Sequence, residues 1–457
     1  MALPNPQPKA PVKLCLWLYF WLLLLEGALR KWILPDFSDL LFIIRDPVAL
    51  ITYVFAIRAG VFPWRPAIVV LWLLAALSLA FSLVGDASFL VTLFGLRTNY
   101  LHIPLIFVMA LTLDRHDVIR FGRWFMICSV PIVLLMVVQF KAGADSWINV
   151  GAGGKVSGQL RGALGHIRPP GPFSFVAGVV SFFGLTAAFV AYGWTQRTVY
   201  SRPFLIVATG AVAASLPISI SRSLMFAVLV VMLFMSVIAV RDVRRMPVYF
   251  GPLIAIGAIL LLAVDTIYVQ ALVVRWDEAM RAGGGNFYSN IVQRLLEEFT
   301  LPFTVAAEAP WFGHGIGMGT VAGARLVTGR HVFLLAESEL PRIVLELGPV
   351  LGFAFIGWRW WLAASLVKKS WSSYLRTGDS LPWLLTGSTF LAVVFGQWGP
   401  ATSLGFAVLG SGLTLAALNE PVEEAGDDDE DDEECEDDDE EEEDSDEPEM
   451  SRSDPKS

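Results

Sequence analysis

Long apolar stretches constrain this chain more than any other feature of its sequence. A helix that crosses a lipid bilayer needs about 20 mostly apolar residues, and twelve stretches approach that length. They are residues 14–30, 38–57, 67–84, 99–113, 124–140, 173–193, 203–219, 222–240, 249–270, 343–366, 381–396 and 399–418. Only 17% of the 457 residues are charged and 55% are hydrophobic, which excludes a soluble fold of this size. The sequence therefore predicts an all-α, polytopic membrane helix bundle of about 12 transmembrane helices, in which residues 86–98 suit a re-entrant or interfacial segment.

Basic residues between these stretches predict the topology. Cytoplasmic loops carry an excess of Lys and Arg, and every second connection in this chain holds at least two such residues. They are Lys9 and Lys13; Arg58 and Arg65; Arg115, Arg120 and Arg123; Arg197 and Arg202; Arg241, Arg244 and Arg245; and Lys368, Lys369 and Arg376. We therefore expect both termini in the cytoplasm. Arg30 and Lys31 follow the first stretch where a signal peptide would have its cleavage site, so a retained first helix is predicted.

Residues 420–457 differ in composition from everything before them. From Glu420 onward the chain holds 24 of its 43 acidic residues and only two bases, Arg452 and Lys456. Residues 1–419 therefore carry a net charge of +12, and the remaining tail carries −22. Such a tail buries too little apolar surface to fold. We expect a transmembrane domain over 1–419 and a disordered, acidic, cytoplasmic tail over 420–457. The three cysteines of the chain show no spacing typical of a disulfide framework or a metal site.

Two connections on the outer side are long. Loop one spans residues 141–172 and loop two spans residues 271–342. Loops of this length are uncommon unless they have a function of their own. Within loop two, residues 286–300 carry apolar side chains at helical spacing with charges between them, which predicts an amphipathic helix. Two interpretations stay open for it: it lies on the membrane surface, or it packs on the outer face of the protein itself.

Arginines are unusually frequent on this outer side, where such loops are normally poor in bases. An anionic ligand held from the outer face is the simplest explanation, because guanidinium groups bind phosphate in bidentate fashion and keep their charge. The candidate phosphate-binding residues are Arg168, Arg222, Arg294 and Arg342. Arg222 opens an apolar stretch and Arg168 precedes two prolines. The alternative for both is that the side chain snorkels to the lipid headgroups.

Two further segments carry candidate chemistry. Residues 310–320 contain four alternating glycines and His314; glycines permit close approach of backbone N–H groups to an anion, although no nucleotide-binding pattern accompanies them. Residues 336–348 place Glu337 and Glu339 just before an apolar stretch. Carboxylates and imidazoles in such places can act as general bases toward a hydroxyl, or they can be structural partners of the nearby arginines. The candidate catalytic residues are Glu337, Glu339 and His314.

The order of these features resembles the superfamily of O-antigen ligases and O-antigen polymerases, which are bacterial membrane glycosyltransferases. The residues that carry the resemblance are Ser221-Arg222-Ser223, the segment from Pro310 to Gly317, and the segment from Glu337 to Gly348 with its Glu-Leu-Gly ending. A long outer loop between two late helices completes the pattern. The resemblance covers roughly residues 70–418 and rests on short motifs.

The resemblance implies a multi-pass protein of the bacterial inner membrane whose active site faces the periplasm. Family members move a glycan from a polyprenyl-diphosphate carrier to a sugar hydroxyl, with no metal and no other cofactor. The implied partners are a polyprenyl-diphosphate-linked glycan, membrane lipid and a glycan acceptor, and no nucleic acid. Arg222 matches the family's helix-start arginine, with Arg168 or Arg294 as its partner. The family's ligases have a His where Glu337 stands here, which favours a polymerase or a related transferase.

Two other classes of function remain open from the sequence. A transporter or flippase for an anionic or lipid-linked substrate usually has polar groups at the membrane midplane. Here the inner spans look nearly charge-free, apart from Arg45-Asp46-Pro47, which favours chemistry at the outer surface. A non-catalytic scaffold would tolerate changes of the outer arginines without loss of glycan.

Overall fold

The computed structural model describes residues 9–156, 158–196, 198–241, 246, 251, 256–258, 261, 263–282, 293–330 and 332–419. Throughout these residues the chain forms helices, turns and loops, and its only pairing of the β type is one isolated antiparallel bridge, between Arg161 and Ile167. The expected all-α class is therefore confirmed. The predicted tail over 420–457 lies outside the described residues.

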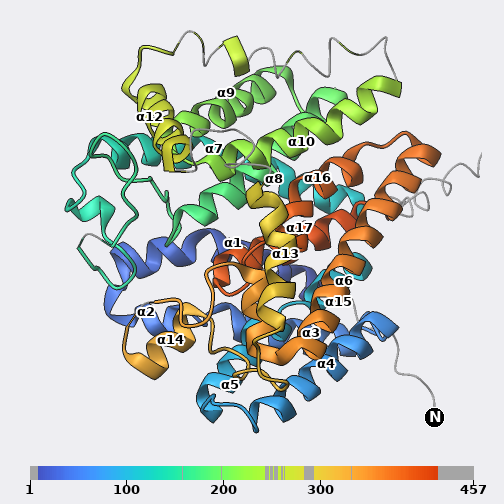
Figure 1. The fold of residues 1–457 in the computed structure, drawn as a ribbon. Coiled ribbons are helices and arrows are strands. Elements are labelled where there is room, and N and C mark those ends of the chain that lie inside the picture. Colours follow the sequence, from blue (N-terminus) through green and yellow to red (C-terminus); the bar gives the residue numbers. More distant parts are fainter. Residues whose placement is uncertain are drawn as a thin grey trace, which may run out of the picture. The chain divides into compact units, whose positions relative to one another are not determined.

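The elements follow one another along the chain as shown in Figure 1. They are α1 (Ala10–Ala28), η1 (Leu29–Ile33), η2 (Pro35–Phe37), α2 (Ser38–Leu41), α3 (Arg45–Arg58), α4 (Pro66–Ser82), α5 (Phe89–Leu96), η3 (Arg97–Leu101), α6 (Pro104–Thr112), α7 (Arg115–Lys141), η4 (Trp147–Asn149), α8 (Val176–Thr195), α9 (Arg202–Ile218), α10 (Arg222–Arg241), α12 (Ile267–Ala282), α13 (Gln293–Ala306), α14 (Val321–Thr328), α15 (Glu339–Thr377), α16 (Leu381–Val394) and α17 (Ala401–Ala416).

Seven helical runs in the described part of the chain are long and apolar enough to cross a membrane. They are Ala10–Ile33, Pro35–Arg58, Phe89–Thr112, Arg115–Lys141, Val176–Thr195, Arg222–Arg241 and Glu339–Thr377. The shorter apolar helices are α4, α9, α16 and α17. This architecture is that of a helical, multi-pass membrane protein. The number twelve stays a prediction, because nine of the 22 residues of the expected span 249–270 lie outside the described residues.

Residues 86–98 were expected to form a re-entrant or interfacial piece. In the structure, residues from Phe89 onward belong to the apolar candidate run Phe89–Thr112, and the expectation stays a prediction. Arg97 lies in the middle of this run, in the π-helical turn η3. Its Nε donates to Asp46 Oδ2 over 2.5 Å, and Asp46 belongs to α3. The charge of Arg97 is thus neutralised by a neighbouring helix.

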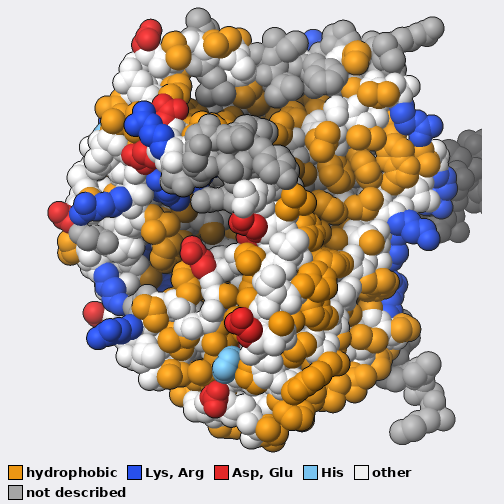
Figure 2. Space-filling view, in the orientation of Figure 1, with side chains coloured by type: hydrophobic (Ala, Val, Ile, Leu, Met, Phe, Trp, Pro, Cys, Tyr) orange, Lys and Arg blue, Asp and Glu red, His pale blue; other side chains and the backbone are white. Residues whose placement is uncertain are grey.

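Hydrophobic side chains cover much of the face shown in Figure 2. On α4, Val69 is 56% and Leu73 is 59% exposed, and on α10 Leu229 and Leu233 are both 59% exposed. Water would penalise such a surface by roughly 25 cal/mol per Å². The hydrocarbon core of a bilayer removes that penalty, which is the physical basis for placing these helices in a membrane.

More charged side chains lie inside the bundle than expected, since the inner spans were expected to be nearly charge-free apart from Arg45-Asp46-Pro47. Glu26 and Arg45 are each 2% exposed, and Arg359 is fully buried. Arg45 Nε donates to Glu26 Oε2 over 2.9 Å, so α1 and α3 share an ion pair. Sequence spacing does not reveal such pairing, because it depends on which helices become neighbours.

The long loops contain structure of their own. Loop two includes the C-terminal part of α12 and all of α13 and α14. The amphipathic helix expected over 286–300 is described only from Gln293, as α13. Phe299 on α13 contacts Trp360 and Phe395, with ring centroids 6.0 and 5.8 Å apart. α13 runs beside α15 in Figure 1, so its apolar face packs against the protein's own helices.

Candidate functional site

Loop one presents Arg168 from a short antiparallel turn over residues 160–168. The Arg168 N–H donates to the Leu160 carbonyl over 2.9 Å, and the Gly162 N–H donates to the His166 carbonyl over 2.8 Å. Two prolines follow Arg168 directly, and each restricts its own backbone and that of the residue before it. The backbone that carries this guanidinium group is therefore fixed on both sides.

Two buried side chains clamp the proline-rich stretch behind Arg168. Lys31 Nζ donates to the carbonyls of Gly171 and Phe173 over 2.6 and 2.8 Å. Gln139 on α7 exchanges two hydrogen bonds with Gly171, one as donor and one as acceptor. Proline-rich backbone offers few donors to its own carbonyls, and these side chains from α7 and the end of the first helical run satisfy them instead.

The turn between α9 and α10 positions Arg222 at the first residue of α10. Ile220 in this turn has φ +47°, a left-handed conformation that is rare for a β-branched residue and costs of order 1–3 kcal/mol. Burial holds it there, since Ile220 is only 1% exposed. A side chain at Gly162 would collide with Ile220 Cδ1 at 2.8 Å and approach Arg168 Cγ at 3.5 Å. The absence of a side chain at Gly162 thus lets loop one lie against this turn.

Three guanidinium groups converge where loop one meets the helices. Burial lowers the pKa of Arg168 below its usual value, and repulsion from Arg275 and Arg222 lowers it further. Arg275 lies on α12 and donates to Glu278 Oε2 over 3.1 Å. Glu278 is thus the acidic group that offsets part of the repulsion. We name Arg168, Arg222 and Arg275 the arginine cluster; it combines three positive charges from three separate segments.

Two donors of the arginine cluster have no acceptor among the residues that the structure describes. The Nε atoms of Arg168 and Arg275 are both buried and without a hydrogen-bond partner among the described residues. An unpaired buried donor costs about 1–3 kcal/mol, and more when it is charged. Like charges brought together at such a cost are typical of a binding site for an anion. A group with several acceptor oxygens and a double negative charge, such as a phosphate ester, matches these donors.

The other two predicted phosphate-binding residues lie elsewhere or cannot be placed. Arg294 falls among side chains outside the described set. Arg342 on α15 is only 3% exposed. Its guanidinium donates to Glu339 and Glu346 over 2.6 to 3.0 Å. In this structure Arg342 therefore belongs to a buried ion-pair network rather than to the arginine cluster.

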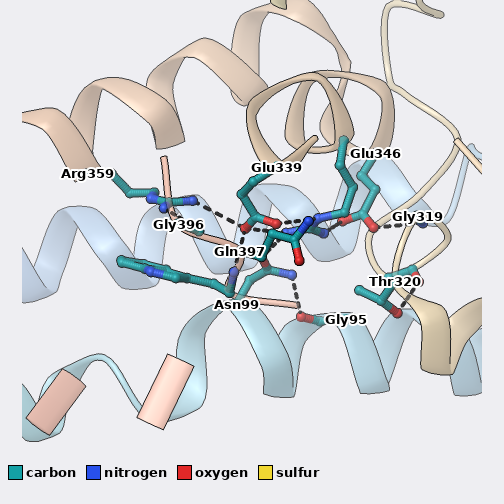
Figure 3. A network of polar contacts seen from close by, with 12 residues as sticks. Gly95, Asn99, Gly319, Thr320, Glu339, Glu346, Arg359, Gly396 and Gln397 are labelled. Atoms are coloured by element: carbon teal, nitrogen blue, oxygen red, sulfur yellow. Dashed lines mark hydrogen bonds and ion pairs between the residues drawn. The ribbon is translucent and has the colours of Figure 1, made fainter. Parts of the chain in front are cut away.

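Figure 3 shows this second network, which joins α15 to its neighbours. Glu339 accepts hydrogen bonds from Arg342, from Arg359 Nη1 over 3.2 Å and from the Trp398 N–H over 3.1 Å. Glu339 is 3% exposed. Because several donors hold its carboxylate, Glu339 serves as a structural anchor for α15.

Glu337 and His314 remain accessible. Glu337 is exposed, and its backbone carbonyl accepts a hydrogen bond from Gln397 over 2.9 Å. His314 is partly exposed, and its Nδ1 lies 3.1 Å from Asp86 Oδ2. Neither side chain hydrogen-bonds to the arginine cluster within the part of the chain that the structure describes.

The glycine-rich segment binds protein groups rather than presenting free donors. Gly313, Gly315 and Gly317 all have positive φ. The Gly315 N–H donates to the Glu346 carbonyl over 3.0 Å, and the Gly319 N–H donates to Glu346 Oε1 over 2.8 Å. Added side chains at the first three glycines would lie 2.3 to 2.5 Å from atoms of other segments. The glycines therefore serve close backbone packing against α5 and α15.

Sequence reasoning singled out two members of the arginine cluster and missed the role of the third. Arg275 was recognisable only as one of several bases in loop two. The sequence shows only that Arg275 lies three residues before Glu278. That spacing points to the site only when the structure places α12 beside loop one. No group of three or more His, Cys, Asp or Glu side chains in the described residues is arranged to hold a metal ion.

Comparison with known proteins finds no protein-family model, no curated protein and no solved structure that matches this chain. The resemblance to the O-antigen ligases and polymerases therefore rests on the short sequence motifs alone and stays a prediction.

Proposed function

We propose that this protein transfers a glycan from a polyprenyl-diphosphate carrier to a sugar hydroxyl in a bacterial inner membrane. The observation that supports this most is the arginine cluster. It gathers three guanidinium groups, with two buried donors that have no partner among the described residues, beside helices that are suited to lipid. A lipid-linked diphosphate has both the charge for the cluster and the apolar chain for the bilayer.

The proposed reaction displaces the diphosphate from the sugar. The bond between C1 of the donor sugar and the phosphate oxygen breaks, and the electron pair leaves with the diphosphate. Arg168, Arg222 and Arg275 stabilise the negative charge that grows on the leaving oxygen, an electrostatic effect that increases toward the transition state. The acceptor hydroxyl forms the new bond and loses its proton. We place this site on the periplasmic side, with both termini in the cytoplasm.

A transfer assay with purified protein in lipid nanodiscs tests the proposal. The donor is a polyprenyl-diphosphate-linked glycan, and product is separated from the lipid carrier by chromatography. We expect Arg222→Ala and Arg168→Ala to lower the turnover rate about 10²–10³-fold. Arg325→Ala is the matched control, because that arginine forms an exposed ion pair with Asp39 at 2.8 Å and such pairs contribute little. Full activity of Arg222→Ala would contradict the mechanism.

One observation favours a second function, the passage of an anionic or lipid-linked substrate across the membrane. Ionisable groups inside membrane helices often mark transport pathways, and Asp46 pairs with both Arg97 and His102 inside the bundle. These groups satisfy one another, as a structural ion-pair network also would. A flux assay in liposomes separates the two functions, since a transferase leaves the lipid-linked glycan in its original leaflet when no acceptor is present.

A further inference from the structure

A histidine of loop one lies on the same face as Arg168. Residues 160–168 form a short antiparallel turn, with the isolated bridge Arg161–Ile167 between two backbone hydrogen bonds. Side chains along paired antiparallel segments alternate between the two faces. His166 and Arg168 are two positions apart and therefore share a face, whereas Ile167 points to the other face and is 2% exposed.

Two contacts hold the His166 ring in one orientation. It stacks on Phe140 at the end of α7, with ring centroids 4.2 Å apart and an angle of 16° between the planes. Its Nδ1 lies 2.8 Å from the Phe140 carbonyl oxygen. Phe140 in turn contacts Tyr268 on α12, with ring centroids 4.6 Å apart. The imidazole is thus fixed between α7 and α12, the helix that also carries Arg275.

The contact with Phe140 determines which ring nitrogen carries the proton. A carbonyl oxygen can only accept a hydrogen bond, so Nδ1 of His166 must be the donor. In the neutral ring the other nitrogen, Nε2, then has a free lone pair. Among the described residues, the hydrogen bond of the His166 ring is the one from Nδ1 to Phe140, so it does not occupy Nε2. An oriented imidazole with an unoccupied Nε2 is the arrangement that general-base catalysis requires.

We propose that His166 is the catalytic base that removes the proton from the acceptor hydroxyl, next to the arginine cluster that holds the leaving diphosphate. This inference rests on the proposed glycosyl transfer and assigns its proton acceptor to a residue of loop one. The hydroxyl oxygen attacks C1 of the donor sugar, and its proton passes to Nε2. The bond from C1 to the phosphate oxygen breaks, and the electron pair stays with the diphosphate. The imidazolium then returns its proton to water as product leaves.

The position suits this role better than those of the other candidates. Glu339 is buried and held by several donors, and the His314 ring is turned toward Asp86. His166 is carried by the same turn as Arg168, two residues away. One rigid segment then holds both the group that accepts the proton and a group that stabilises the leaving diphosphate.

Variants of His166 test the assignment in the nanodisc transfer assay. We expect His166→Ala to lower turnover about 10²–10⁴-fold, and added imidazole to restore about tenfold of that loss by taking the place of the missing ring. Inorganic pyrophosphate should bind His166→Ala as it binds the parent protein. His166→Gln keeps a donor for the Phe140 carbonyl but has no basic nitrogen, so it should fold and remain inactive. His116→Ala, an exposed position near the other end of α7, is the matched control and should be fully active.

The outcomes separate this inference from the proposed function. If the parent protein transfers glycan and His166→Gln does so at a similar rate, His166 is not the base and the transferase proposal stands. Loss of pyrophosphate binding in both His166 variants would assign the residue a structural role and overturn the inference. If the parent protein transfers no glycan while pyrophosphate binds, the proposed function fails and this inference fails with it.

Discussion

Replacement of Arg342 by methionine tests whether the buried network of α15 stabilises the fold. Arg342 is the only cation paired with Glu346 in the described part of the chain, at 2.6 Å, and both side chains are at most 4% exposed. Glu339 keeps Arg359 as a partner at 3.2 Å. Arg342→Met therefore leaves one buried carboxylate, that of Glu346, without a counter-charge. Loss of one partner from a buried ion pair costs about 3–5 kcal/mol, which is the expected decrease in the free energy of unfolding.

A second substitution should recover most of that loss. Glu346→Gln, added to Arg342→Met, removes the unpaired charge and keeps the oxygen that accepts from the Gly319 N–H at 2.8 Å. Replacement of a whole buried ion pair by neutral groups is often close to neutral. The double variant should therefore be about 2 kcal/mol or more above the single variant in unfolding free energy.

Unfolding in mixed micelles titrated with dodecyl sulfate, followed by tryptophan fluorescence, measures both changes; the chain has 16 tryptophans. Arg325→Met is the matched control, because its pair with Asp39 is exposed and contributes about 0–1 kcal/mol. The reasoning is refuted if Arg342→Met costs less than the control, or if the double variant is no more stable than the single one.

Three further changes have defined outcomes. Gly317→Ala should lower the unfolding free energy by about 2–4 kcal/mol, because the new Cβ would lie 2.5 Å from a backbone oxygen. Gly329→Ala is the control, since Gly329 also has a positive φ, of +71°, but open space around it; it should cost only about 1–2 kcal/mol. Equal losses in the two variants would contradict this reasoning. Lys31→Met should speed amide hydrogen exchange across residues 166–175 without changing exchange at α17, because Phe173 loses its buried donor; unchanged exchange there would show that the clamp is dispensable. Burial raises the pKa of Glu298, so folding favours its protonated form. The contribution of this group to the unfolding free energy is fully present below its unfolded pKa. It is lost as the pH rises through its folded pKa. Glu298→Gln should therefore unfold at a higher denaturant concentration than the parent at about pH 7 and at a similar one below about pH 4; an equal difference at both pH values would exclude this cause.

The helices were predictable because length and apolar composition alone decide whether a segment suits a bilayer. The expected span 67–84 matches α4, Pro66–Ser82, and the expected span 173–193 matches α8, Val176–Thr195. The expected re-entrant or interfacial piece at 86–98 stays a prediction. The pairing of Arg97 was not predictable, because its partner Asp46 lies 51 residues away in the chain. A charge inside a helix can be judged only when its neighbour is known.

In the candidate site, too, some features were predictable from the sequence and others depend on which segments become neighbours. Arg168 and Arg222 were grouped from the sequence because each precedes an apolar stretch, and the structure brings them close enough to repel each other. The involvement of Glu339 with Arg342 follows the spacing of three residues on one helix. The bond from Arg342 to Asn99, which are 243 residues apart, has no signal in a single sequence.

The strained turn at Ile220 has a consequence for how the site becomes ordered. Ile220 can hold its left-handed backbone only while its side chain is buried, and part of that burial comes from Gly162 in loop one. Neither the start of α10 nor loop one can reach its final form before the other. Arg168 and Arg222 therefore reach their positions in a single cooperative step, and local unfolding at one of them also displaces the other. A ligand bound by both arginines would therefore stabilise the contact between loop one and the start of α10.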